Sequence, residues 1–505
     1  MTGKRNIRSR CPISRLARRL VALGLLTLGC WQPAESQTRQ KVTLDLDRTI
    51  RLATDSSLAA QKYHSVYDAA RYQYLSWMAS RKPQVSLKGT PLQYEQYIAQ
   101  RYLSEENRDI YREQKLLIAK GGINVEQVME PWGGTFYGNT ALGYMKTFGE
   151  GGETQFTTVP INIGYRQQLL GFNALKWNRR LEPIKMKAAE KQLTYDIETT
   201  SEKAVERFFE LALAQEQYRI AEEYLQSCDT TFAIAKRRFH IASIPKAELD
   251  ILELTKINAQ NALANARIAH QKASRRLASL LGMNEDTEIV LRIPTEMANL
   301  TIDAAEAIAE ARENNPQYVS QQEKTEEARR DAAKAKIDKG LSVNVDASIG
   351  LNQVASRLSD AYRRPLVQDM AVITLSIPLK DWGKGRNNYL AAKSKVEAAE
   401  RSAAEGSRDT ELEVSVTVAE FNERQAIVET ARHALTIAED AYAAMMRRFM
   451  NAQATVNDIT LTQTHWQTAL QNQITSLQHY WQSYYHLRLL TLYDFQKREK
   501  IVHTK

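Results

Sequence analysis

The chain has 505 residues, of which 68 are Lys or Arg and 59 are Asp or Glu, giving a net charge of +9. Residues 1–36 contribute +6 of this charge through seven basic residues and one acid, which leaves +3 for the remainder. A balance so close to neutral excludes a protein that binds nucleic acid through its overall charge.

The N-terminus has the pattern of a secretory signal peptide. Basic residues precede an apolar run at residues 20–29 that is too short to span a membrane. Small residues before Gln37 favour cleavage there, so the signal peptide is residues 1–36, although a lipobox-like stretch ending at Cys30 leaves lipoprotein processing open. Cleavage before Gln37 leaves Cys228 as the last cysteine, so the exported chain has no intrachain disulfide.

The exported chain is an internal duplication. At an offset of 210 residues, the "RRF" stretch that ends at Phe239 matches the one that ends at Phe449. Near the start of each copy the offset is 258, so the first copy is 48 residues longer. We assign residues 37–299 to the first copy, 300–495 to the second and 496–505 to a C-terminal tail.

The additional 48 residues lie between two predicted strands of the first copy. They include the Gly-rich stretch "EPWGGTFYGNTALGYMKTFGEGGE", which has no counterpart in the second copy. Glycine-rich segments are typical of turns and surface loops. We therefore predict an inserted loop over about residues 96–154, with short strands within it as the alternative.

The second copy predicts the order helix, strand, strand, helix, helix. Apolar residues alternate with polar ones in both strands, whereas the helices follow the helical period. The predicted strands are 341–351 and 371–379, and the predicted helices are 304–339, 386–449 and 456–492. The first copy has weaker strand patterns beginning at Pro83 and Phe156.

These elements do not fit a compact monomer. The helix ending at Phe449 would be roughly 95 Å long. No stretch after residue 36 has the roughly 20 apolar residues of a membrane-spanning helix, but β-barrel strands need only alternating hydrophobicity. Four strands cannot close a barrel, and open strand edges in lipid would leave backbone groups unpaired. The residues therefore predict assembly with other subunits, without giving their number.

Three motifs resemble those of the TolC-like outer-membrane efflux proteins. They are "IAEARENNP" at 308–316, "IPLKDWGKGR" at 377–386, and "RRF" before an acidic helix start. The resemblance covers essentially the whole exported chain. It implies a mainly α fold with a membrane β-barrel: a homotrimer whose 12-stranded barrel in the outer membrane continues into a long α-helical barrel in the periplasm.

The resemblance also implies a function and partners. The chain would be the exit duct of a tripartite efflux or type I secretion system, working with a periplasmic adaptor protein and an inner-membrane transporter. Such a duct contacts outer-membrane lipid, catalyses no reaction and needs no cofactor or metal. An exported helical scaffold without a channel is the main alternative. A periplasmic enzyme is a weaker one, because no nucleophile or metal-ligand set is present.

The resemblance places functional residues at the two periplasmic helix turns. Asp458 and Glu248 would narrow the channel there, although acids near helix N-termini are also expected as simple caps. Four arginines would hold neighbouring helices together at the tip: Arg237, Arg238, Arg447 and Arg448. The turns facing the adaptor would comprise Phe239, Ala242, Pro245, Phe449 and Ala452. Ser243, Thr455 and Asn457 are candidate N-caps for the helices that follow.

Overall fold

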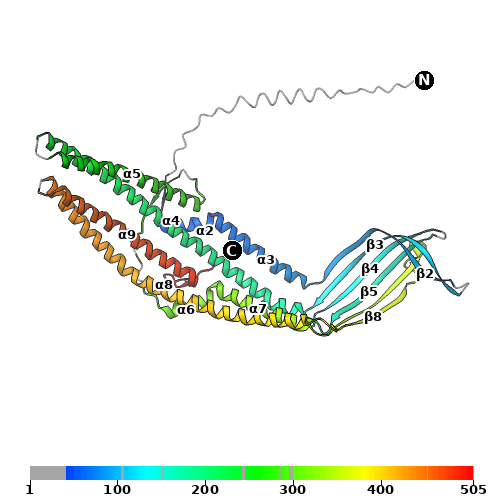
Figure 1. The fold of residues 1–505 in the computed structure, drawn as a ribbon. Helices are drawn as coiled ribbons and strands as arrows, with labels where there is room; N and C mark the ends of the chain where they lie inside the picture. The colour runs from blue at the N-terminus through cyan, green and yellow to red at the C-terminus, as the bar shows by residue number, and fades with distance from the viewer. Residues whose placement is uncertain are drawn as a thin grey trace, which may run out of the picture.

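The computed structural model describes residues 41–103, 107–149, 152–241, 245–284, 287–294, 297, 300–451 and 453–503. The chain is long and narrow, with one sheet at one end and the turns of two helical hairpins at the other (Figure 1). The predicted signal peptide lies outside the described residues, as do Ala242, Ser243 and Ala452.

The two copies contribute similar sets of elements. The first comprises β1 (Lys41–Leu44), α2 (Leu46–Ser56), α3 (Leu58–Ser80), β2 (Gln84–Leu103), β3 (Arg108–Met129), β4 (Gly134–Phe148), β5 (Thr154–Gln168), α4 (Ala174–His240), α5 (Lys246–Leu280) and β6 (Glu288–Leu291). The second comprises α6 (Ala304–Asn314), α7 (Pro316–Asp338), β7 (Ser342–Ala355), the 3-10 turn η1 (Leu358–Asp360), β8 (Leu366–Ser376), α8 (Lys384–Met450), α9 (Val456–Thr491), β9 (Tyr493–Asp494) and β10 (Glu499–Lys500). None of the described helices is both long enough and apolar enough to cross a membrane.

Helix lengths confirm the internal duplication. The two longest helices, α4 and α8, both have 67 residues and begin at Ala174 and Lys384, which are 210 positions apart. The shorter helices α3 and α7 both have 23 residues and begin at Leu58 and Pro316, which are 258 positions apart. The two offsets found in the sequence are therefore the offsets between equivalent helices.

The predicted single helix over 304–339 is two helices in the structure. The break lies at Asn315, whose side chain accepts a hydrogen bond of 2.9 Å from the backbone N–H of Gln317. Pro316 follows as the first residue of α7 and disfavours a helical backbone at the residue before it. The equivalent residue of the first copy, Ser57, caps α3 in the same way. The periodic pattern hid both breaks because the helical period continues across them.

The long sheet has six antiparallel strands in the order β2-β3-β4-β5-β7-β8. The prediction of an inserted loop over 96–154 is therefore wrong, because this segment contains the end of β2 and all of β3 and β4. The sheet of each chain has six strands rather than the four that the sequence predicts, so three copies would contain 18 such strands rather than 12. Gly121 and Gly122 concealed β3 by interrupting its alternating apolar residues.

One face of this sheet is apolar across all six strands. Residues directly opposite one another in neighbouring strands share a face, as Ile163 and Ile349 do, and likewise Val345 and Ile373. The other large apolar residues of this face that are exposed in the single chain include Val85, Leu87, Ile123, Val125, Phe136, Leu142, Ile161, Val367 and Leu375. An exposed apolar face of this extent needs a covering layer.

The opposite face of the sheet is polar. Asp346 of β7 accepts hydrogen bonds from the Tyr137 hydroxyl at 2.7 Å and from Arg166 Nε at 2.9 Å. Asn162 Nδ2 donates to Asn139 Oδ1 at 2.9 Å on a neighbouring pair of strands. A sheet with one apolar and one polar face is typical of a barrel wall that separates lipid from water.

The largest core cluster lies among the helices, where the two copies meet. Phe208 and Phe209 of α4 are fully buried, as are Tyr480 and Tyr484 of α9. Between them, the Phe421 ring of α8 lies 5.2 Å from the Tyr480 ring and 5.7 Å from the Tyr484 ring, measured between centroids. These aromatic contacts join helices from both halves of the sequence into one bundle.

Candidate functional site

The first helix turn, between α4 and α5, has no side-chain cap among its described residues. The backbone N–H of Ile241 donates to the Phe239 carbonyl at the end of α4. Pro245 is the N-cap of α5 and makes no side-chain capping bond. The Glu248 N–H donates to the Pro245 carbonyl at 3.2 Å, so Glu248 lies in the first turn of α5.

The second helix turn, between α8 and α9, is closed by a capping box. Thr455 is the N-cap of α9, and its hydroxyl accepts a hydrogen bond of 3.2 Å from the Asp458 N–H. The Asp458 carboxylate in turn accepts from the Thr455 N–H at 2.9 Å and from the Thr455 hydroxyl at 2.7 Å. Of the two candidate caps, Thr455 is therefore the one that the structure uses, and Asn457 is not.

The capping box fixes the charge state of Asp458. Hydrogen bonds from Thr455 lower the pKa of the Asp458 carboxyl below its ordinary value, and the positive charge of Arg448 adds to this effect. The carboxylate is therefore ionised at neutral pH. The interpretation of Asp458 as a helix cap is confirmed, and a second role in a channel stays a prediction.

The arginines near both turns are exposed. Arg237 at the end of α4 and Arg447 and Arg448 at the end of α8 form no intrachain ion pair in the part of the chain that the structure describes. The Arg447 and Arg448 carbonyls accept hydrogen bonds from Asn451 and Gln453 and so close the turn. The Arg238 and Phe449 side chains lie outside the described residues.

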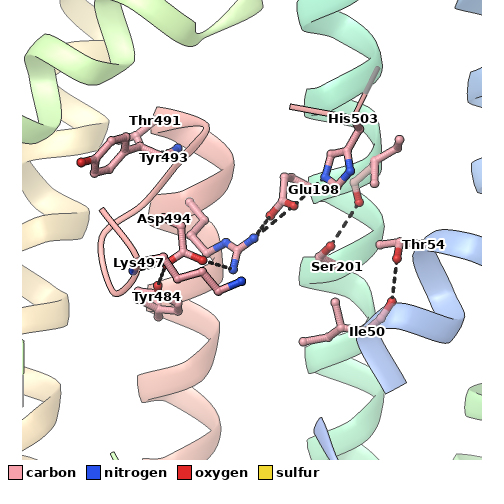
Figure 2. Close-up of polar contacts among 12 residues, drawn as sticks. Ile50, Thr54, Glu198, Ser201, Tyr484, Thr491, Tyr493, Asp494, Lys497 and His503 are labelled. Carbon is pink, nitrogen blue, oxygen red and sulfur yellow. Dashed lines mark hydrogen bonds and ion pairs between the residues drawn. The ribbon is translucent and has the colours of Figure 1, made fainter. Parts of the chain in front are cut away.

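A buried polar network joins α4 to the C-terminal segment, far from both turns. Figure 2 shows Glu198 of α4 facing Asp494 and His503 of that segment. Between them, Arg488 of α9 places Nη2 3.3 Å from the Glu198 carboxylate and Nη1 3.0 Å from Asp494. The Tyr484 hydroxyl donates to Asp494 at 2.8 Å, and His503 Nε2 lies 3.2 Å from Glu198.

Sequence reasoning missed this network. The available signal was Arg488, which lies alone among the apolar residues of "LRLLTL" on a helix. A single charge within an apolar helical run indicates a buried partner. The partner, Glu198, is 290 positions away and has no local pattern that reveals it.

His486 connects three helices. Its Nδ1 lies 2.9 Å from Glu202 of α4, and its Nε2 lies 3.5 Å from Glu413 of α8. The hydrogen bond to Glu202 and the charges of both glutamates raise the pKa of His486, although burial acts in the opposite direction. No local sequence pattern points to these contacts of His486, so the ion pair is a finding of the structure.

Replacing His486 with Gln should destabilise the helical bundle at acidic pH but not at alkaline pH. Because the folded-state pKa is raised, the stabilisation is complete below the unfolded value of about 6.5 and disappears as pH rises through the folded value. Thermal unfolding of both proteins followed by circular dichroism at pH 5.5 and pH 9 measures this. An equal difference between the two proteins at both pH values would contradict it.

The fold is shared with solved outer-membrane channels. The chain is 14% identical to the outer membrane protein VceC of Vibrio cholerae, with a TM-score of 0.63 over 90% of this chain and 96% of that one. It is 12% identical to the Campylobacter jejuni CmeC outer membrane channel, with a TM-score of 0.66 over 91% and 87%. A membrane protein from Pseudomonas aeruginosa is 15% identical, with a TM-score of 0.63 over 88% and 90%. No curated protein matches the chain by sequence.

A family model decides the assignment. The model described as "Outer membrane efflux protein" matches residues 140–283 and 307–491, which is more than half of the chain. The chain belongs to the outer membrane efflux protein family. The resemblance to TolC-like proteins is thereby confirmed, together with the outer-membrane location and the extension into the periplasm.

Membership of this family gives the outer membrane efflux protein an efflux channel role. The members are channels, which are not enzymes, so the assignment favours the channel over an exported scaffold. The assignment also indicates the surroundings of the two ends of the molecule. The apolar sheet face suits the outer membrane, and the helix turns lie at the end opposite the sheet (Figure 1). The helix turns therefore lie at the periplasmic end.

Proposed function

We propose that three copies of this chain form the exit duct of a tripartite efflux or type I secretion system. The observation that carries this proposal is the open sheet: within the described residues, β2 and β8 each have a neighbour on one side only. Strand edges cannot stay unpaired in lipid, so a membrane-inserted sheet of this kind needs further copies of itself. The duct conducts cargo passively from the periplasm to the exterior.

In this proposal the periplasmic turns contact the other components. A periplasmic adaptor protein binds around the turn residues, which include the half-buried Phe239, the exposed Pro245 and, in the second copy, Phe449. An inner-membrane transporter supplies the energy, since the described part of the chain has no nucleotide-binding motif. The exposed arginines Arg237, Arg447 and Arg448 are free to pair with acids of neighbouring subunits or of the adaptor.

We further propose that the acids of the two turns narrow the duct. Asp458 and Glu248 occupy equivalent positions in the first turns of α9 and α5. Around a threefold axis, three copies would bring together six carboxylates, and such a ring attracts cations. The capping box supports this for Asp458 because it holds the carboxylate ionised and in one place.

Isolation of the exported protein tests the proposal. Extraction should require detergent, native mass spectrometry should give the mass of three chains, and the purified oligomer should form ion-conducting pores in planar bilayers. The pores should close or vanish when the trimer is dissociated. A protein released without detergent as a single chain would refute the duct and restore the helical scaffold as the better interpretation.

A further inference from the structure

Residues 84–129 form a hairpin that begins and ends at the same place in the fold. Arg81, just after α3, forms an ion pair with Glu130, just after β3, with Nη2 3.0 Å from Oε2. The Gln127 side chain donates to the Arg81 carbonyl at 2.9 Å. The hairpin of β2 and β3 is therefore a complete unit that leaves the start of β4 beside the end of α3.

The turn after this hairpin is fixed to the first long helix. Asn173, the N-cap of α4, donates to the Glu130 carbonyl at 3.2 Å and accepts from the Lys176 N–H at 3.1 Å. Gly133 has a φ of +80°, and a Cβ there would lie 3.1 Å from the Asn173 side chain, so a glycine suits this turn. The hairpin is thus attached at the junction between sheet and helices, as a wall element would be.

The hairpin continues both faces of the sheet. Val85 and Leu87 of β2 lie opposite Val125 and Ile123 of β3, and all four are exposed apolar residues on the apolar face. On the polar face, Lys88 Nζ lies 3.9 Å from Glu126 Oε1. A hairpin that forms a loop or a plug does not need apolar and polar faces that line up with those of the neighbouring strands. A strand of a barrel wall does need them.

The two open edges are complementary. Each pair of neighbours in the order β2-β3-β4-β5-β7-β8 is antiparallel, so β2 and β8 run in opposite directions. Every residue of β8 is exposed in the single chain. In β2, the segment from Gln84 to Gly89 precedes the bulge at Thr90–Gln93 and offers a regular edge.

We infer that β2 of one copy pairs with β8 of the next, so that three copies close an 18-stranded barrel. This inference rests on the proposed trimer and gives each subunit six strands instead of the four predicted from the sequence. Barrel diameter grows roughly linearly with strand number, so the lumen is about half again as wide as that of 12 strands. The β-barrel then admits bulky cargo, and selection by size falls to the helix turns.

Cysteine cross-linking between subunits tests which strand borders β8. In a Cys228→Ala background, one cysteine replaces Ile373 or Leu375 on β8, and a second replaces Val85 or Leu87 on β2. All four positions lie on the apolar face near the junction with the helices. A short thiol cross-linker applied in detergent should give covalent dimers and trimers from at least one of these pairs. Val345→Cys with Ile373→Cys is the intrachain control, because these residues are direct partners.

In the competing arrangement, β4 of one copy pairs with β8 of the next, and the β2–β3 hairpin lies outside a 12-stranded wall. Its diagnostic pair is Phe136→Cys on β4 with Leu375→Cys on β8, again on the apolar face. Covalent trimers from this pair would overturn the inference, and so would an intact trimer without any β2–β8 cross-link. A wild-type protein that forms no oligomer would instead refute the proposed trimer itself. Native mass spectrometry of each variant separates failed assembly from a wrong neighbour.

Discussion

Replacing Arg488 with Met is expected to lower the free energy of unfolding of the helical bundle by about 3–5 kcal/mol. Arg488 lies between two carboxylates, and the side chains of Glu198 and Asp494 are only 1% and 5% exposed. Methionine fills a similar volume but removes the guanidinium that pairs with both of these buried carboxylates. Chemical denaturation of the detergent-solubilised protein, followed by circular dichroism, measures the loss.

A surface ion pair provides the matched control for this substitution. Arg432 pairs with Glu429 at 2.7 Å on α8, and both side chains are at least half exposed. The variant Arg432→Met should lose less than about 1 kcal/mol because solvent screens such pairs. Adding Glu198→Gln to Arg488→Met should recover part of the loss, since it removes one stranded charge. Equal losses from Arg488→Met and Arg432→Met would show that the network contributes no more than a surface pair.

Replacing Asp458 with Asn is expected to reduce the cation selectivity of single channels while leaving the trimer intact. Asparagine keeps an oxygen that can accept the hydrogen bonds of the capping box but removes the charge from each subunit. If three such charges surround the narrowest point, their loss lowers the local concentration of cations. The ratio of cation to anion permeability, obtained from reversal potentials in a salt gradient, measures this effect.

Thr455 provides the complementary variant. Thr455→Ala removes the hydroxyl that caps α9 and should cost about 1 kcal/mol of helix stability. It leaves the Asp458 charge in place, so selectivity should change little. An unaltered permeability ratio in Asp458→Asn would remove this residue from the channel lining and leave it only the capping role that the structure shows.

The helices could be predicted well because their signals are local. The helical period, the cap at Thr455 and the acid three residues after it all lie within short stretches of sequence. The predicted helix over 456–492 corresponds to α9 at Val456–Thr491, and the predicted helix over 386–449 corresponds to α8 at Lys384–Met450. The break at Asn315 shows the limit of this reasoning, because periodicity alone does not report a cap inside a periodic segment.

The sheet was harder to predict because strands are stabilised by neighbours. β3 and β4 contain many glycines, and their apolar residues are evident only when they are aligned with those of adjacent strands. The register places Leu142 opposite Gly121 and Thr140 opposite Ile123, so one strand supplies the bulk that the other lacks. Such compensation between strands is invisible in a single segment, and the segment therefore resembled a loop.

The sequence by itself determined the duplication, the long helices and the positions of both turns, because spacing, capping residues and proline act over a few residues. Tertiary structure alone decided that the sheet has six strands and that Glu198, Arg488, Asp494 and His503 meet in one buried network. Glu198 and His503 are 305 positions apart. Their contact depends on how the two copies pack together, which no local pattern encodes.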